Sequence, residues 1–292
     1  MPYVGRFAPS PTGPLHLGSL TTAVASYLHA RQAGGEWLVR VEDIDPLREP
    51  PGAAAEILRT LDAYGLHWDR DIVYQSTRFT AYRAAAEGLL ERGVAFRCSC
   101  SRKDVEETGG GARPYPGTCR SRATHSGPTS IRMRVERGTF GFRDSLQGQV
   151  DVDVHDAEGD YVVYRRDDLP AYHLAVVLDD HWQGVDTIVR GRDLLAMTPV
   201  HMHLRQVLGL PEPRYLHLPV LTEHQGVKLS KQTGAAAVGP VYSAETAVRV
   251  LELLGLKVPT EAHGARSAEL WGWAIRNWRI EELIGRQSIH IG

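Results

Sequence analysis

The first forty residues contain the pattern that most constrains the fold. Residues 3–7 are apolar and β-prone, and residues 9–14 form a turn-rich loop with three prolines and a glycine. Apolar residues then recur at helical spacing from Leu17 to Gln32, and Gly34–Gly35 ends this helix. Residues 37–41 are the next predicted strand. Such a β–loop–α–β unit is typical of an α/β fold with a doubly wound, parallel nucleotide-binding sheet.

The same patterns predict the later elements. We expect helices at residues 53–64, 79–90, 198–208, 244–254 and 267–278, and apolar strands at 171–178, 187–189 and 215–221. Thr198 and Ser243 are the expected N-caps of two of these helices, and Pro199 suits the first helical position.

A polar region interrupts this alternation. Residues 98–130 are rich in Gly, Arg and Pro and hold every cysteine of the chain. Four short strands, antiparallel by expectation, follow at 130–135, 139–143, 150–154 and 161–165. We therefore divide the chain into a first half of the parallel-sheet domain (1–96), an insertion (97–170), a second half of that domain (171–240) and a small helical tail (241–292).

Composition excludes some classes of protein. Hydrophobic residues make up 42% and charged residues 23% of the 292 residues, which is ordinary for a globular protein. No apolar run approaches the roughly 18 residues of a membrane helix. The first residues also lack the basic and apolar segments of a secretory signal. We expect a cytoplasmic protein without a membrane partner.

Positive charge is concentrated in the first part of the insertion. The chain has a net charge of −2, but residues 97–143 contain ten basic and four acidic residues, a local charge of +6. A cationic segment of this kind can bind phosphates, although a solvated Arg-rich surface has the same composition. Charge alone does not choose between the two.

Two short motifs suit phosphate chemistry. His16 and Gly18 lie at the start of the first predicted helix, where unpaired N–H groups favour anions. Far downstream, Lys228, Ser230 and Lys231 form a KLSK motif in a loop with Gly234. Each motif alone also has a structural explanation: helix capping for His16 and Gly18, and an exposed basic loop for the KLSK motif. Together they resemble the HIGH and KMSKS elements of class I aminoacyl-tRNA synthetases. This resemblance implies that all five residues bind ATP, with His16, Gly18 and Lys231 acting in catalysis.

Further blocks resemble glutamyl-tRNA synthetase over residues 1 to about 240. They are RFAPSPTG at 6–13, LVRVEDID at 38–45, YHLA at 172–175 and DDH at 179–181. The resemblance implies a Rossmann-type core that activates glutamate with ATP and Mg²⁺. It also implies the glutamate-binding residues Arg6, Ala8, Ser10, Glu42, Tyr172 and Arg190. Arginine suits this task because its planar fork matches both oxygens of a carboxylate. For Glu42 a structural ion pair and for Tyr172 simple packing are the alternatives, and for Arg40 we favour a structural role.

The region after the KLSK motif is short for a glutamyl-tRNA synthetase. Those enzymes continue into a large anticodon-binding region, whereas this sequence ends about sixty residues after Lys231. With the cysteine cluster, this pattern resembles the glutamyl-Q tRNA(Asp) synthetase family. The resemblance implies activation of glutamate without tRNA and its transfer to queuosine, the wobble base of tRNA(Asp), by a protein that we expect to be a monomer. The alternatives are a synthetase that charges a tRNA 3′ end and a non-catalytic tRNA-binding paralogue.

Cys98, Cys100 and Cys119 are an odd, clustered set without an export signal, which favours a metal site over disulfides. A structural zinc ion takes four ligands. Ordinary ligand preference suggests His125 as the fourth. The family resemblance instead implies Tyr115, because Tyr115 and Cys119 match its Tyr-x-x-x-Cys pattern. We prefer Tyr115 as the fourth ligand and keep His125 as the alternative. A cluster of three reduced cysteines without a metal is the remaining possibility.

Overall fold

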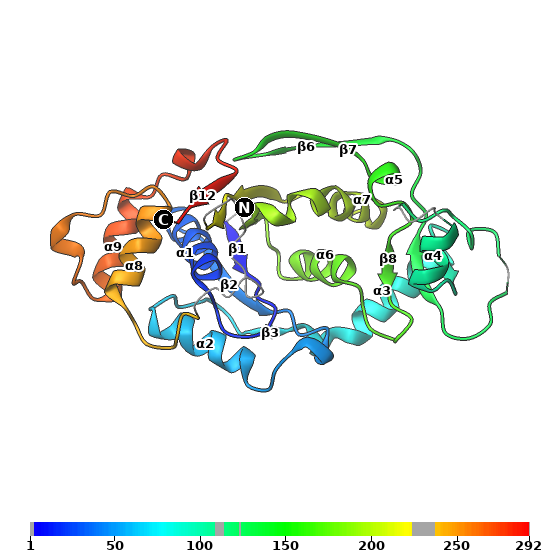
Figure 1. Ribbon diagram of the computed structural model, residues 1–292, viewed down its shortest axis with the longest axis horizontal. Coiled ribbons are helices and arrows are strands. Elements are labelled where there is room, and N and C mark those ends of the chain that lie inside the picture. The colour runs from blue at the N-terminus through cyan, green and yellow to red at the C-terminus, as the bar shows by residue number, and fades with distance from the viewer. Residues whose placement is uncertain (1–2, 109–113, 123, 224–236, 292) are drawn as a thin grey trace.

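The structure is a computed structural model that describes residues 3–108, 114–122, 124–223 and 237–291. The molecule is elongated (Figure 1). Helices α8 (Ala244–Leu253) and α9 (Ser267–Asn277) lie at one end and α4 (Arg102–Thr108) lies at the other. The parallel strands of the fold lie between these two ends.

A parallel sheet forms the centre of the fold. Strands β1 (Val4–Phe7), β2 (Glu36–Val41) and β3 (Val73–Tyr74) pair in parallel, as do β9 (Thr187–Gly191) and β10 (Arg214–Leu218). Strand β9 lies beside β1, where the Asp186 N–H donates to the Val4 carbonyl at 3.1 Å. The spatial order is therefore β3-β2-β1-β9-β10, and almost every residue of β1, β2 and β9 is buried.

Helix α1 (Leu17–Gln32) has the predicted bounds and packs on β1, β2 and β9. Its buried side includes Leu20, Val24 and Leu28, each 0% exposed. Gly34 follows its end with a φ of +65°, a conformation that glycine adopts without a Cβ penalty.

The insertion contains the antiparallel strands that the sequence predicts. Strands β4 (Ala95–Cys98), β5 (Ser130–Met133) and β8 (Val162–Tyr164) form one sheet. Strands β6 (Thr139–Asp144) and β7 (Gly148–Asp153) form a hairpin, and the short helix α5 (Val154–Ala157) follows it. The hairpin runs along the top edge in Figure 1, away from α4 and toward the end of the chain. Because its turn contacts residues of β10 and of the tail, the insertion reaches the parallel sheet.

The remaining helices lie close to their predicted positions. They are α2 (Ala53–Ala63), α3 (Phe79–Glu91) and α7 (Thr198–Leu208). The structure adds 3-10 turns that the sequence analysis did not predict, at Pro46–Arg48, Gln75–Arg78, Arg192–Met197, Thr260–Ala262 and Ile280–Leu283. Ser243 caps α8 as expected, since its side chain accepts from the Thr246 N–H at 3.1 Å. Within the described ranges, no helix is both long and apolar enough to span a bilayer.

Several expectations were wrong. The strand expected at 171–178 is the helix α6 (Tyr172–Trp182); its apolar run is continuous because Leu174, Ala175, Val176 and Val177 are all buried, so the pattern does not distinguish it from a buried strand. The predicted strand 215–221 is two strands, β10 and β11 (Val220–Thr222), separated at Pro219, which has no N–H.

Two further corrections concern α7 and the tail. Thr198 is the first residue of α7 rather than its cap, and its hydroxyl contacts Arg190 instead. The tail is not purely helical, because β12 (Ser288–His290) pairs in parallel with β11. The boundaries drawn at residues 96, 170 and 240 stay a prediction.

Candidate functional site

One cavity of about 560 Å³ lies where β1 and β9 end and α1 begins. Its walls come from the loop after β1, the first turns of α1, the end of β2, α6, and the strands β9 to β11. The structure brings together here every predicted glutamate and ATP residue that it describes: Arg6, Ala8, Ser10, His16, Gly18, Glu42, Tyr172 and Arg190. The KLSK residues Lys228, Ser230 and Lys231 lie outside the described residues.

A buried ion-pair network forms one wall. The Arg6 Nε lies 3.0 Å from Asp180 Oδ1, and the Arg40 Nη1 lies 2.8 Å from the same oxygen. Arg40 Nη2 also lies 3.3 Å from Glu42 Oε1. These four side chains are at most 5% exposed, so β1, β2 and α6 are fixed to one another below the cavity. Arg40 is 0% exposed and has a structural place in this network, as expected.

Burial and charge determine the ionisation of these groups. Burial opposes ionisation of Asp180, but the charges of Arg6, Arg40 and Arg205 outweigh it and lower the pKa of this carboxyl far below its usual range. Burial raises the pKa of Glu42, although Arg40 and Arg6 oppose that shift. Burial likewise raises the pKa of the Tyr172 phenol, which keeps the hydroxyl neutral and able to donate a hydrogen bond.

Arg190 comes from β9 and is 4% exposed. Its Nε donates to His217 at 3.0 Å, its Nη2 donates to the Thr198 hydroxyl at 2.7 Å, and its Nη1 lies 3.3 Å from His201. These partners are neutral in charge, so they orient the guanidinium without neutralising it. Among the buried charged side chains that line the cavity, Arg6 and Arg190 are positive and Glu42 is negative, an excess of one positive charge. The arrangement therefore favours an anionic ligand.

His16 is the N-cap of α1, and its Nδ1 accepts from the Ser19 N–H at 3.3 Å. A Cβ on Gly18 would lie 3.1 Å from two atoms of the His16 ring. Gly18 thus leaves room for the histidine as well as for any ligand. Residue Val238, which follows the KLSK region, donates its N–H to the Leu15 carbonyl at 2.7 Å, so the chain returns to the start of α1.

Sequence reasoning missed several residues around this cavity. His217 and Thr198 contact Arg190, and Asp144 contacts His217; the three residues come from three other elements, and no motif marks them. Leu254 and Ile289 line the cavity from the tail. A sequence signal for these contacts is lacking, because each depends on how distant segments meet.

Comparison with known proteins decides the family. Residues 3–264 match the catalytic domain of the tRNA synthetases class I (E and Q). The glutamyl-Q tRNA(Asp) synthetase of Dechloromonas aromatica (strain RCB) is 48% identical, over 99% of this chain and 97% of that protein. The one from Methylococcus capsulatus (strain Bath) is 47% identical, over 100% and 96%. The chain belongs to the glutamyl-Q tRNA(Asp) synthetase family. It is therefore a ligase-type enzyme of class I, and the family expected from the sequence is confirmed.

Solved structures agree on the fold. The glutamate-tRNA synthetase from Elizabethkingia anophelis superposes with a TM-score of 0.82 at 23% identity, over 100% of this chain and 68% of that one. A glutamate tRNA ligase from Elizabethkingia meningosepticum in complex with its amino acid gives 0.82 at 24% identity, over 100% and 67%. These similarities confirm the Rossmann-like catalytic fold that the sequence predicts.

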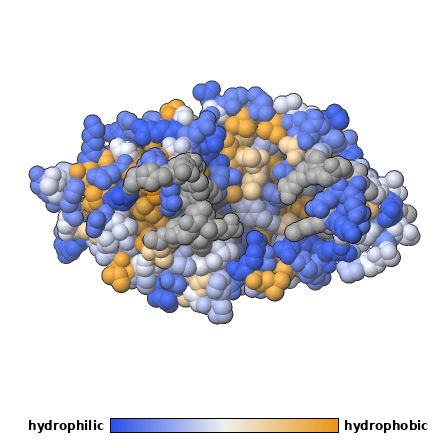
Figure 2. Space-filling view, viewed as in Figure 1, coloured by the Kyte–Doolittle hydropathy of each residue, from blue (hydrophilic) through white to orange (hydrophobic). Residues whose placement is uncertain are grey.

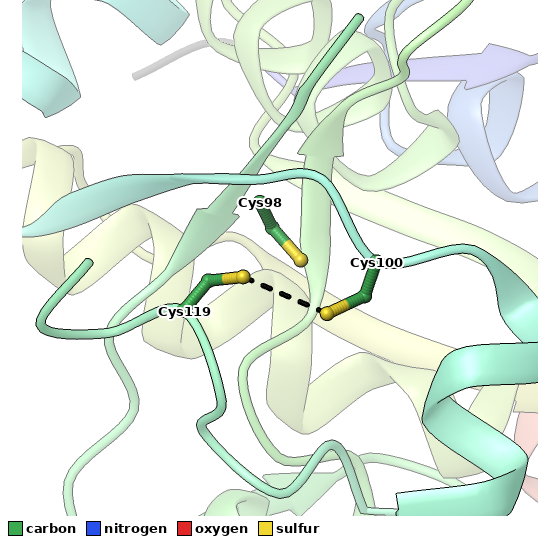
Figure 3. A group of neighbouring side chains, drawn as sticks. All are labelled: Cys98, Cys100 and Cys119. Carbon is green, nitrogen blue, oxygen red and sulfur yellow. Dashed lines mark hydrogen bonds between the residues drawn. The ribbon is translucent and has the colours of Figure 1, made fainter. Parts of the chain in front are cut away.

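The cysteines of this family member meet in the insertion. The Sγ atoms of Cys98, Cys100 and Cys119 all lie within 4.8 Å of one another, with 3.6 Å between Cys100 and Cys119, and Figure 3 shows them pointing toward one point. The Tyr115 hydroxyl lies 3.3 Å from the Cys98 Sγ and 3.8 Å from the Cys100 Sγ. His125 is directed elsewhere, with Nδ1 3.3 Å from the Ser99 hydroxyl. Four donor atoms, three sulfurs and one phenol oxygen, therefore converge.

The chemistry of this donor set fits zinc, which binds thiolates in tetrahedral sites. Although burial opposes it, hydrogen bonds from Tyr115 and the Ser99 backbone lower the pKa of Cys119 to about 7. Burial and the neighbouring thiol of Cys119 raise the pKa of Cys100 to about 11. A zinc ion would deprotonate both thiols, since metal binding requires the thiolate.

Proposed function

We propose that this enzyme activates glutamate with ATP, without a requirement for tRNA, and transfers it to queuosine at the wobble position of tRNA(Asp). The observation that carries the proposal is that one cavity is lined by Arg6, Glu42 and Arg190 together with His16 and Gly18. Relatives named glutamyl-Q tRNA(Asp) synthetase, at 47–48% identity over almost the whole chain, support the identity of the acceptor.

The charges of the cavity suit glutamate. Arg6 and Arg190 would bind its side-chain carboxylate with help from Ser10 and the Tyr172 hydroxyl, while Glu42 would accept the α-ammonium. Ala8 lines the cavity beside them without a charge of its own. The excess buried positive charge supports this assignment, because a carboxylate neutralises it whereas a glutamine amide does not.

The first reaction needs no protein nucleophile. The α-carboxylate of glutamate attacks the α-phosphate of ATP; glutamyl-adenylate forms and pyrophosphate leaves. Positioning and charge neutralisation carry such a step. His16 and the first N–H groups of α1 would stabilise the phosphate charge, and Gly18 would admit the nucleotide. The KLSK residues Lys228, Ser230 and Lys231 would hold the pyrophosphate, and Mg²⁺ would accompany ATP.

The second reaction places an anticodon loop at the same cavity. The first part of the insertion, residues 97–143, has a local charge of +6 and would contact the RNA backbone and position the loop. A structural zinc ion held by Cys98, Cys100, Tyr115 and Cys119 would stabilise this part of the insertion, which has few apolar side chains of its own. We further propose that the protein acts as a monomer in the cytoplasm.

On the face shown in Figure 2, hydrophilic residues cover most of the rim, and hydrophobic patches lie near the upper middle and in the left part. The hydrophilic rim suits a nucleic-acid partner, since phosphate contacts need polar and cationic side chains.

The test is to incubate the protein with ATP, Mg²⁺ and radiolabelled glutamate, and to offer matched tRNA pools from cells with and without queuosine. We expect label only in the queuosine-containing pool, and we expect it to remain when the tRNA 3′ end is oxidised beforehand. Label in both pools that is lost after 3′ oxidation contradicts the proposal, because it indicates an ordinary charging enzyme. Glutamate-dependent pyrophosphate exchange without tRNA tests the first step separately; its absence in an otherwise intact protein excludes tRNA-free activation.

A further inference from the structure

Behind Arg190 lies a pair of buried residues to which the proposed reaction gives no part. His217 on β10 is 0% exposed and Asp144 at the end of β6 is 1% exposed. Asp144 Oδ2 lies 2.6 Å from His217 Nδ1, and His217 Nε2 lies 3.0 Å from Arg190 Nε. A chain of hydrogen bonds thus leads from the hairpin of the insertion to the wall of the cavity.

The direction of each hydrogen bond follows from the chemistry. A neutral imidazole has one N–H and one acceptor nitrogen, and a carboxylate only accepts. The proton of His217 therefore lies on Nδ1 toward Asp144, and Nε2 accepts from the Arg190 N–H. The charge states agree: burial lowers the pKa of His217 despite the hydrogen bond to Asp144. Burial opposes ionisation of Asp144, but the hydrogen bond from His217 outweighs it and lowers the pKa.

We propose that Asp144 and His217 are positioning residues that fix the guanidinium plane of Arg190 for a carboxylate ligand; this rests on the proposed binding of glutamate. The guanidinium has five N–H donors. His217 takes the one on Nε, Thr198 one on Nη2, and His201 faces Nη1. Among the described residues these partners account for three donors and leave one on each terminal nitrogen, the pair that a carboxylate binds in bidentate fashion.

Asp144 is itself held in place by the turn of the hairpin. Its Oδ1 accepts from the Leu146 N–H at 2.9 Å and from the Gln147 N–H at 2.8 Å. The Gln147 side chain donates to the His217 carbonyl at 2.8 Å, which fixes the hairpin to β10 a second time. Tyr215 stacks on the His217 ring at 11° with 5.9 Å between centroids, and the Arg190 guanidinium lies 5.3 Å from the centroid of the same tyrosine. The tip of the insertion therefore determines how Arg190 faces the cavity.

The experiment uses Asp144→Asn, which keeps the oxygen that binds the hairpin turn. The new amide can donate an N–H to His217 Nδ1, so the imidazole proton moves to Nε2. The Nε2 proton then faces the Arg190 N–H, and the hydrogen bond between these two nitrogens is lost. In glutamate-dependent pyrophosphate exchange, with and without total tRNA, we expect the KM for glutamate to rise about tenfold or more. We expect the KM for ATP and the melting temperature to change little. Asp151→Asn, the same substitution at an exposed position of the same hairpin, is the matched control.

A second variant separates positioning from packing. In His217→Gln the side-chain amide oxygen can accept from the Arg190 N–H, and an amide has no tautomers that Asp144 could select. Asp144→Asn should therefore raise the KM for glutamate only slightly in the His217→Gln background. If Asp144→Asn raises the KM for glutamate equally in the wild-type and His217→Gln backgrounds, the positioning role is overturned. The same holds if the enzyme depends on glutamate but Asp144→Asn alone does not raise this KM. Neither result affects the proposed function. A folded wild-type protein without glutamate dependence under either condition overturns the proposed function and this assignment with it.

Discussion

Arg6 and Asp180 lie 174 positions apart in the sequence, yet their side chains form a buried ion pair of 3.0 Å between the end of β1 and α6. The pair joins two of the sequence blocks that carry the resemblance to glutamyl-tRNA synthetase. It also places the guanidinium of Arg6 in the wall of the cavity.

Asp180→Asn should destabilise the protein by about 3–5 kcal/mol, because it removes the carboxylate that pairs with the buried Arg6 and leaves the buried Arg40 with Glu42 alone. Chemical denaturation measures this loss. Asp167→Asn removes an exposed carboxylate that pairs with Arg165 and should cost less than about 1 kcal/mol. Similar losses in the two variants contradict the prediction.

Arg190→Ala should weaken glutamate activation by about 1.5–3 kcal/mol, the contribution of a hydrogen bond to a charged group. Pyrophosphate exchange at varied glutamate concentration gives the catalytic efficiency directly. Arg214→Ala, an exposed arginine on the neighbouring strand, is the control and should change little. Unchanged efficiency in Arg190→Ala rules out the role of this residue in glutamate binding.

Tyr115→Phe should lower the zinc content of the purified protein after dialysis against a chelator, whereas His125→Ala should not. The phenylalanine keeps the ring over which the Arg132 guanidinium lies, 4.1 Å from the centroid, and removes only the oxygen beside the sulfurs. Metal analysis by mass spectrometry is the measurement. If His125→Ala loses zinc and Tyr115→Phe retains it, the fourth ligand is the histidine.

Stability should fall as the pH decreases below about 6.5. Burial lowers the pKa of His201, and Arg190 and His173 add to this effect; burial also lowers the pKa of His217. Below pH 6.5, the ordinary pKa of histidine, these side chains take up protons in the unfolded chain but not yet in the folded protein. The free energy of unfolding therefore decreases as the pH falls from 6.5 to the lower pKa values of the folded protein. The slope is about 1.4 kcal/mol per pH unit for each proton. Urea denaturation between pH 7.5 and 5 measures it, and a flat or opposite profile contradicts the prediction.

Trp278→Ala should destabilise the protein by about 3–5 kcal/mol, since this side chain is 1% exposed in the core that joins the tail to α1. Trp182→Ala removes a tryptophan that is 57% exposed and should cost much less. Thermal and chemical unfolding compare the two. Equal effects would mean that the tail does not share the core.

Contiguous patterns made most of the fold predictable. Helix α1 and the strands of the first β–loop–α–β unit follow from local periodicity and from Gly34. The run at 172–182 was misassigned because burial on nearly all sides removes the periodicity that distinguishes a helix from a strand.

The candidate site was predictable only where motifs carry it. Arg6, His16 and Glu42 belong to recognisable blocks, and the structure places them around one cavity. Asp144 and His217 come from different segments, 73 positions apart, and only the folded chain brings them together behind Arg190. No local pattern encodes such a meeting, and therefore sequence reasoning missed it.

The pairing of β12 with β11 has a consequence for biosynthesis. Ile289 belongs to β12 and lines the same cavity as Arg6, which is translated long before it. The cavity therefore remains unfinished on the ribosome until residues 288–290 have left the exit tunnel. We expect nascent chains arrested before that point to hold nucleotide more weakly than the released protein, because one wall of the cavity is still missing.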